Sequence, residues 1–178
     1  MKSYLILLLS IILAGCTFHE EYSNKRKQAY KTIAEVVNEL NHLYQLNPVG
    51  IGESANENYY TLIELDFYLY HKLSKDEGRK ILIESTKILL DKINSNVELN
   101  QYLQPFPFTE KNVKLAIFVF EDGKQPYYPE ICVFSCKKGK ITYSTETPET
   151  KFGYYTTEEE SFEEALAIVK SQQTNHRN

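Results

Sequence analysis

Apolar residues recur at every third or fourth position in several segments of the chain, and this spacing predicts amphipathic helices. The predicted helices are residues 24–45, Ser74 to about residue 94, a short segment over residues 97–103, and a terminal helix that Thr157 caps and residue 158 begins. Ser74 and Glu77 have the spacing of a capping box, in which each side chain satisfies a backbone amide of the other residue. Gly78 lies in the first turn of this helix, where a glycine is slightly destabilising.

The segments between these helices contain runs in which apolar and polar residues alternate, or in which nearly all residues are apolar, and both patterns predict β-strands. The predicted strands are residues 60–71, 113–121, 131–136, 140–145 and 152–157. In the first strand the outward positions are Glu64, Asp66, Tyr68 and Tyr70. The second strand is apolar on both faces, as expected of a central strand that is covered on two sides. Residues 50–56 are expected to form a loop, and Lys137 to Lys140 a tight hairpin.

The order of these elements predicts a single α+β domain. We expect an antiparallel sheet of four to five strands with helices packed mainly on one face. The domain is predicted to cover residues 24–171, and residues 172–178 to form a frayed tail. A chain of 178 residues is long enough to bury a core of its own without disulfides or metal ions.

The chain begins with a cationic residue, Lys2, followed by an apolar stretch that ends in Leu13-Ala14-Gly15-Cys16. This segment resembles the signal of the bacterial membrane lipoproteins. The resemblance implies that residues 1–15 are a signal peptide and that Cys16 carries a covalent lipid, which would be the only bound group. Residues 16–23 would then tether an extracytoplasmic domain to the membrane. Thr17 after the cysteine favours the outer membrane in a Gram-negative host.

The net charge of −4 argues against nucleic-acid binding, which requires a basic surface. Two cysteines besides Cys16 are present, Cys132 and Cys136. On a regular strand their Cα atoms would lie roughly 13 Å apart, too far for a disulfide. We therefore expect two buried thiols that share one face of the strand. This pair, without a nearby pair of histidines, is no metal-ligand set.

No pattern typical of a catalytic site is present. Glu64 and Asp66 share one face of their strand, whereas His71 lies on the opposite face of a regular strand. Glu53 could join a site only from elsewhere in the chain. We therefore expect no catalytic residues.

Three tyrosine pairs lie near predicted turns, and tyrosine is favoured both in cores and at protein interfaces. The residues predicted to bind a partner are Tyr127, Tyr128, Tyr154 and Tyr155. The leading hypothesis is a non-enzymatic envelope module that binds another envelope protein or a cell-wall component. The alternative is a periplasmic small-ligand carrier or hydrolase with a pocket between sheet and helices. A third possibility is a toxin-neutralising or host-contacting lipoprotein.

Overall fold

The structure is a computed structural model that describes residues 24–56, 58–126, 128–147 and 153–175. A helix over residues 24–44 comes first. The following elements are β1 (Asn47–Ala55), β2 (Tyr60–Leu69), α2 (Lys75–Ser95), α3 (Val97–Asn100), the 3-10 turn η1 (Glu110–Asn112), β3 (Val113–Val119), β4 (Val133–Lys137), β5 (Lys140–Thr145), β6 (Tyr155–Ser161) and α4 (Phe162–Asn175). The predicted α+β class is confirmed.

In the described part of the chain, the strands form one six-stranded sheet in the order β1-β2-β3-β4-β5-β6. The prediction of four to five strands was therefore too low. Strands β2 and β3 are parallel, and the other neighbouring pairs are antiparallel. The parallel pair arises because α2 lies between them in sequence and returns the chain to the same end of the sheet. The sheet is thus mostly antiparallel.

The sixth strand is β1, part of which was wrongly predicted as a loop. Its two glycines lie opposite carboxylates of β2, with Gly50 paired to Asp66 and Gly52 to Glu64. A Cβ atom at either glycine would lie 3.3 Å from the Cβ of its partner. Because β1 is an edge strand paired on one side only, it needs little apolar burial of its own, and its sequence therefore carries no strand-like alternation.

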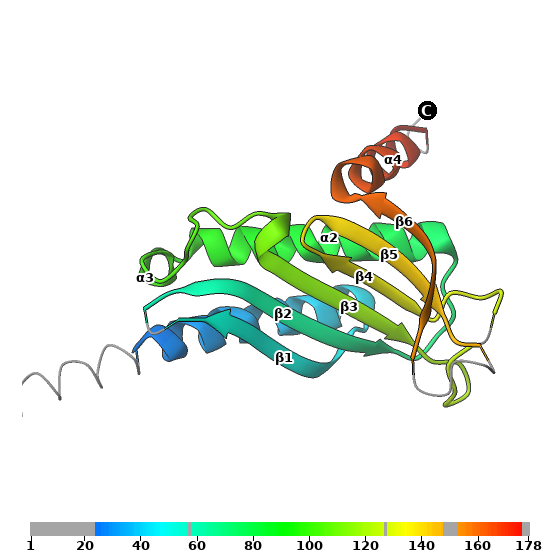
Figure 1. The fold of residues 1–178 in the computed structure, drawn as a ribbon, viewed down its shortest axis with the longest axis horizontal. Coiled ribbons are helices and arrows are strands. Elements are labelled where there is room, and N and C mark those ends of the chain that lie inside the picture. Colours follow the sequence, from blue (N-terminus) through cyan, green and yellow to red (C-terminus); the bar gives the residue numbers. More distant parts are fainter. Residues whose placement is uncertain (1–23, 57, 127, 148–152, 176–178) are drawn as a thin grey trace, which may run out of the picture.

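The core lies between the sheet and the helices that cover one of its faces (Figure 1). The helix over residues 24–44 runs behind β1 and β2, and α2 runs behind β3 and β4. The fully buried residues of this core include Val36, Leu40, Leu65, Phe67, Leu82, Leu89, Ile117 and Phe134. The inward residues of β2 are those that the alternation predicted.

Helix α2 approaches the sheet closely at its first turn. The predicted capping box is confirmed, since Ser74 and Glu77 satisfy each other's backbone amides. Gly78 is buried, and a Cβ atom there would lie 2.1 Å from Cε1 of Phe134. No side chain fits in that space, so the glycine that costs helix propensity allows α2 to pack on β4.

The start of the last helix was predicted four residues too early. Residues predicted as its first turn belong instead to β6, where Glu159 pairs with Thr142 of β5. Helix α4 begins at Phe162 after a second capping box: the Ser161 hydroxyl accepts from the Glu164 amide, and the Glu164 carboxylate accepts from the Ser161 amide. The helix continues to Asn175, beyond the predicted end of the domain at residue 171.

Both thiols outside the leader are free and buried, as expected. Cys136 belongs to the core between sheet and helices, whereas Cys132 lies just before β4 and outside that core cluster. Burial raises the pKa of each thiol to about 11. Both groups therefore stay protonated at neutral pH, which makes them weak nucleophiles.

Replacing Gly78 with alanine tests the close packing of α2. Alanine has the higher helix propensity by about 1 kcal/mol, yet we expect a net loss of about 1–3 kcal/mol in the free energy of unfolding, because the new methyl group overlaps Phe134. Urea denaturation measures the change. The matched control is Gly153→Ala, where nothing lies within 4 Å of the added Cβ. A Gly78→Ala protein as stable as the wild type would contradict this packing.

Candidate functional site

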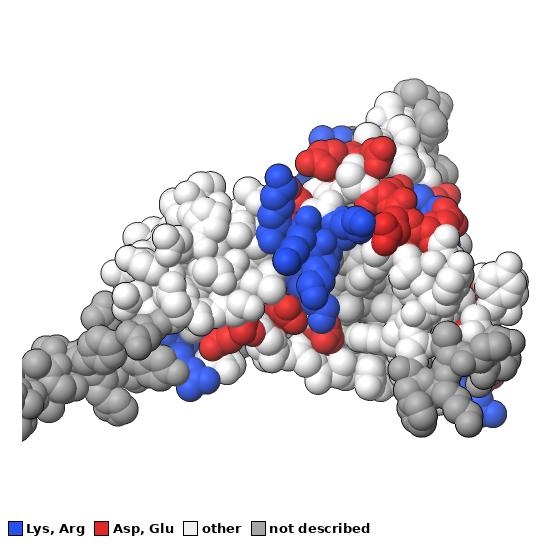
Figure 2. Space-filling model, viewed as in Figure 1, with Lys and Arg blue, Asp and Glu red and all other residues white. Residues whose placement is uncertain are grey.

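The second face of the sheet carries no helix of the described residues, and we call it the open face (Figure 2). Cross-strand register arranges its side chains in rows that run across neighbouring strands. One row consists of Glu64, Lys114, Lys137 and Lys140, and the next consists of Asp66, Ala116, Ser135, Thr142 and Glu159. A third row contains Tyr68, Phe118, Val133 and Ser144. The face therefore changes from charged to aromatic along the strands.

The aromatic part of the open face is a continuous set of rings, which we call the aromatic cluster: Tyr68, Tyr70, Phe118, Phe120 and Tyr154. The Tyr68 and Phe120 ring centroids are 4.8 Å apart, and those of Tyr68 and Phe118 are 6.1 Å apart, both edge-to-face. Tyr154 joins through Phe118 at 5.9 Å, and Tyr70 joins through Phe120 at 6.1 Å. These separations lie within the range of favourable ring contacts.

The cluster is held in place and yet is open to solvent. Tyr70 is 61% exposed and Tyr154 is 45% exposed. The Tyr154 hydroxyl donates a 2.8 Å hydrogen bond to Oε1 of Gln125, and partial burial raises the pKa of this hydroxyl. Because the rings support one another before any partner arrives, little side-chain entropy would be lost on binding.

The charged part of the open face contains three lysines opposite one another on adjacent strands, which we call the lysine row: Lys114, Lys137 and Lys140. Lys114 Nζ lies 3.2 Å from Asp66 Oδ1 and 3.5 Å from Glu64 Oε2. Lys140 Nζ lies 2.8 Å from Glu159 Oε2. Figure 2 shows a band of basic side chains across the middle of this face, bordered by acidic groups.

Lys137 is the central residue of the lysine row, and its side chain is exposed. Like charges directly opposite each other destabilise a sheet. The predicted tight hairpin places Lys137 directly opposite Lys140. Strand β4 ends at Lys137, β5 begins at Lys140, and the two residues between them have positive φ. An arrangement that costs stability in the free protein favours an anionic partner at this point of the face.

Three of the tyrosines predicted to bind a partner, Tyr128, Tyr154 and Tyr155, lie at the aromatic end of the sheet. Tyr154 belongs to the aromatic cluster, while Tyr128 is 65% exposed and Tyr155 is 59% exposed. Tyr127 lies outside the described residues. Whether these residues bind a partner stays a prediction.

Phe118 and Phe120 were missed because β3, apolar on both faces, was interpreted as covered on two sides. That interpretation was wrong for the described residues, since no helix covers its outer face. The outward Tyr68 and Tyr70 of the neighbouring strand were the only signal that could have placed the phenylalanines on an open surface.

Of the residues weighed as acid–base candidates, Glu64 and Asp66 lie close together, whereas His71 and Glu53 do not join them. Glu64 and Asp66 are outward on β2, as predicted, and both pair with Lys114. His71 follows the end of β2 and is exposed, and Glu53 lies on the edge strand β1. No group of three His, Cys, Asp or Glu side chains among the described residues could hold a metal ion.

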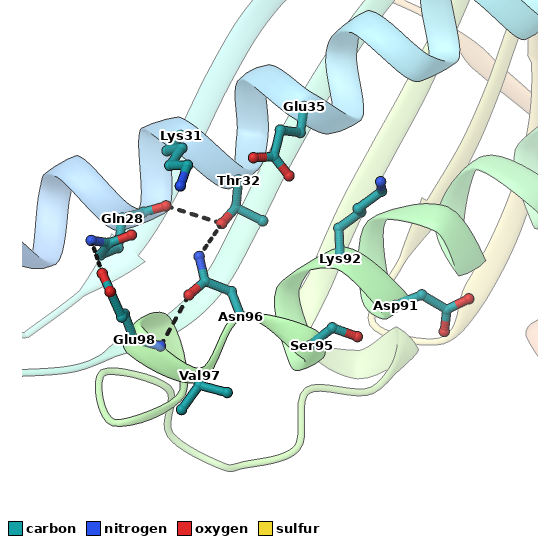
Figure 3. Close-up of a pocket in the computed structure, with 10 residues that line it drawn as sticks. All are labelled: Gln28, Lys31, Thr32, Glu35, Asp91, Lys92, Ser95, Asn96, Val97 and Glu98. Atoms are coloured by element: carbon teal, nitrogen blue, oxygen red, sulfur yellow. Dashed lines mark hydrogen bonds between the residues drawn. The ribbon is translucent and has the colours of Figure 1, made fainter.

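A groove of about 570 Å³ lies between the helix over residues 24–44 and the ends of α2 and α3 (Figure 3). Its inner polar groups satisfy one another: Asn96 donates to the Thr32 hydroxyl at 2.8 Å, and Gln28 donates to the Glu98 carboxylate. These bonds attach α3 to the first helix, which is a structural role. The groove contains neither His71 nor Glu53, and it does not lie between sheet and helices.

A buried ionic cluster joins β6 to α2. Arg79 Nε lies 2.7 Å from Glu160 Oε1, and their side chains are 6% and 14% exposed. Tyr143 donates its hydroxyl hydrogen bond to the same carboxylate, and burial raises the pKa of that hydroxyl. Because each buried charge has a partner, this cluster fixes the last strand rather than offering a free reactive group.

No protein-family model, curated protein or solved structure matches this chain. Among the described helices, none is long and apolar enough to cross a bilayer.

The lysine row leads to a prediction about stability. Replacing Lys137 with glutamine should raise the free energy of unfolding by about 0.5 kcal/mol at low salt, because it removes like-charge repulsion on both sides. The gain should shrink in 1 M salt, where charges are screened within about 3 Å. Urea denaturation at both salt concentrations measures it. Lys138→Gln in the turn is the matched control, and a Lys137 variant that gains no more than this control would refute the repulsion.

Proposed function

We propose that this chain is a lipid-anchored bacterial envelope protein whose open face binds another protein of the envelope without catalysing a reaction. The observation that carries this proposal is the aromatic cluster beside the lysine row on a sheet face that no described helix covers. Protein interfaces commonly have an aromatic centre and a polar rim, and both are present on this face.

The anchor is the lipid predicted on Cys16. This residue and the tether over residues 16–23 lie outside the described residues, so the anchor rests on the Leu13-Ala14-Gly15-Cys16 sequence alone. A diacylated or triacylated cysteine gives durable attachment, since two or more chains are needed for stable membrane binding. The location is then extracytoplasmic, at the outer membrane where the host has one.

The partner is inferred from the chemistry of the face. Apolar side chains of a partner protein would pack on the aromatic cluster, and carboxylates of the same partner would contact the lysine row at Lys137. Burying aromatic rings supplies affinity, whereas matching charges direct the orientation and speed of association. A cell-wall component is the competing occupant, and the experiment below separates the two.

A small-ligand carrier or hydrolase receives less support. The groove between the helices is lined by polar groups that already bond to one another, such as Thr32 and Asn96. Neither His71 nor Glu53 lines it. A carrier pocket is usually concave and largely apolar, with a few converging polar groups.

Capture of a partner from native membranes tests the proposal. The wild-type protein should crosslink to and co-purify with one protein, and the double variant Tyr70→Ala/Tyr154→Ala should lose it. Truncating an interface aromatic of this kind costs about 2 kcal/mol, or about 30-fold in affinity, which titration with the purified partner measures. Both side chains are well exposed, so the fold should persist.

The matched control is Tyr30→Ala/Leu43→Ala, two residues of similar exposure on the helix over residues 24–44. This control should retain the partner. The variant Tyr127→Ala/Tyr128→Ala tests separately whether the predicted turn contributes. Capture of cell-wall fragments instead of a protein, or equal capture by all variants, would overturn the proposal.

A further inference from the structure

Four segments meet at the end of the domain that contains residue 24, and we call this the tether end. They are the start of the first helix, the β1–β2 turn, α3 and the loop over residues 101–108. Lys25 Nζ donates to the Asn56 carbonyl at 3.0 Å, which joins the first helix to the β1–β2 turn. Gln28 donates to Glu98, which joins the same helix to α3. The loop over residues 101–108 completes this end, since the Tyr60 amide donates to the Tyr102 carbonyl at 2.7 Å.

The loop over residues 101–108 is fastened at two points and projects between them. The Gln104 amide donates to the Tyr60 carbonyl at 2.9 Å. Further along, the backbone of Phe108 bonds in both directions to the Asn94 side chain, each at 2.8 Å. Phe106 lies between these two points and is 52% exposed. Because the loop is fixed, it presents the ring at little entropic cost.

The tether end carries exposed apolar side chains and few charged residues around this ring. Val97 of α3 is 82% exposed, and Tyr59 of the β1–β2 turn is 38% exposed. No charged residue occurs from residue 99 to residue 109. In Figure 2 this end, at the left of the view, has an uncharged surface over most of its visible area.

Lys31 lies beside the exposed Val97, and Lys27 lies one helical turn before Lys31. Lys27 and Lys31 are exposed and one helical turn apart, so they share a face of the first helix. Lys31 lines the same groove as Val97 and Glu98, and the Glu98 carboxylate is already bonded to Gln28. Exposed apolar side chains flanked by lysines are typical of a surface that lies at a membrane interface.

The distance to the predicted anchor favours the same partner. Eight residues, 16–23, separate the domain from the lipid on Cys16, and a chain of that length spans at most about 28 Å. The first helix therefore begins close to the bilayer, whatever conformation these residues adopt. We infer that the tether end lies on the phospholipid surface, with Phe106 and Val97 among the headgroups and Lys27 and Lys31 against lipid phosphates. This inference rests on the lipid anchor of the proposed function.

The orientation has a consequence for the open face. Strand β2 starts at the tether end with Tyr60 and reaches Tyr68 of the aromatic cluster after eight residues, or about 26 Å. A domain that stands on its tether end therefore holds the aromatic cluster away from the bilayer, where another envelope protein can reach it.

Single-tryptophan variants test the orientation, because the chain contains no tryptophan of its own. The full lipidated chain carrying Phe106→Trp is reconstituted into phospholipid vesicles that contain a spin-labelled headgroup quencher. We expect a blue-shifted emission and several-fold stronger quenching than for Tyr70→Trp at the aromatic end. Val97→Trp is a second reporter at the tether end and should behave like the Phe106 variant.

Equal quenching at positions 106 and 70, or none at 106 and 97, would overturn the inference. A chain that does not enter vesicles, with no lipid mass on Cys16, would overturn the anchor and the inference with it. Quenching reports bilayer contact alone. Its failure with a lipidated chain would therefore leave protein capture by the open face intact, and the two results stay distinguishable.

Discussion

Strands β2 and β3 are parallel neighbours, and a parallel pair can be joined only by a connection that leaves the sheet and returns across one of its faces. Here that connection contains α2, and such crossovers have the same hand in nearly all proteins. Once α2 covers one face, with Gly78 against Phe134, the first helix and α4 extend the same apolar layer. All of these helices pack on that face of the sheet. The side chains of the opposite face therefore pack only against one another.

That opposite face is stabilised in two different ways along the strands. At one end the rings of the aromatic cluster shield one another, and in the middle Glu64 and Asp66 offset the charge of Lys114. Each arrangement also carries a cost, because exposed rings lose burial and adjacent lysines repel. A partner that covered the face would offset both costs. The buried Arg79–Glu160 pair meanwhile fixes β6, so the face keeps its shape in the free protein.

Features set by neighbouring residues could be predicted from the sequence. The alternation in β2, the Ser74–Glu77 capping box and the bounds of β5 were all correct, since each depends on residues close in sequence. Features set by distant partners could not. Strand β1 is recognisable only by its pairing with β2. The start of β6 was predicted within residues 152–157, but its second half is recognisable only by the position of its glutamates opposite β5. For the same reason the sequence indicated outward tyrosines but not the phenylalanines that join them, because register between strands is not encoded locally.

Site-specific photocrosslinking in native membranes tests the central claim most directly. A benzophenone side chain replaces Tyr70 in the aromatic cluster or, in a matched variant, the exposed Asn38 on the helix side. If the open face binds an envelope protein, illumination should produce one defined protein adduct from position 70 and none from position 38. Equal adducts from both positions, or no protein adduct from position 70, would contradict a binding role for this face.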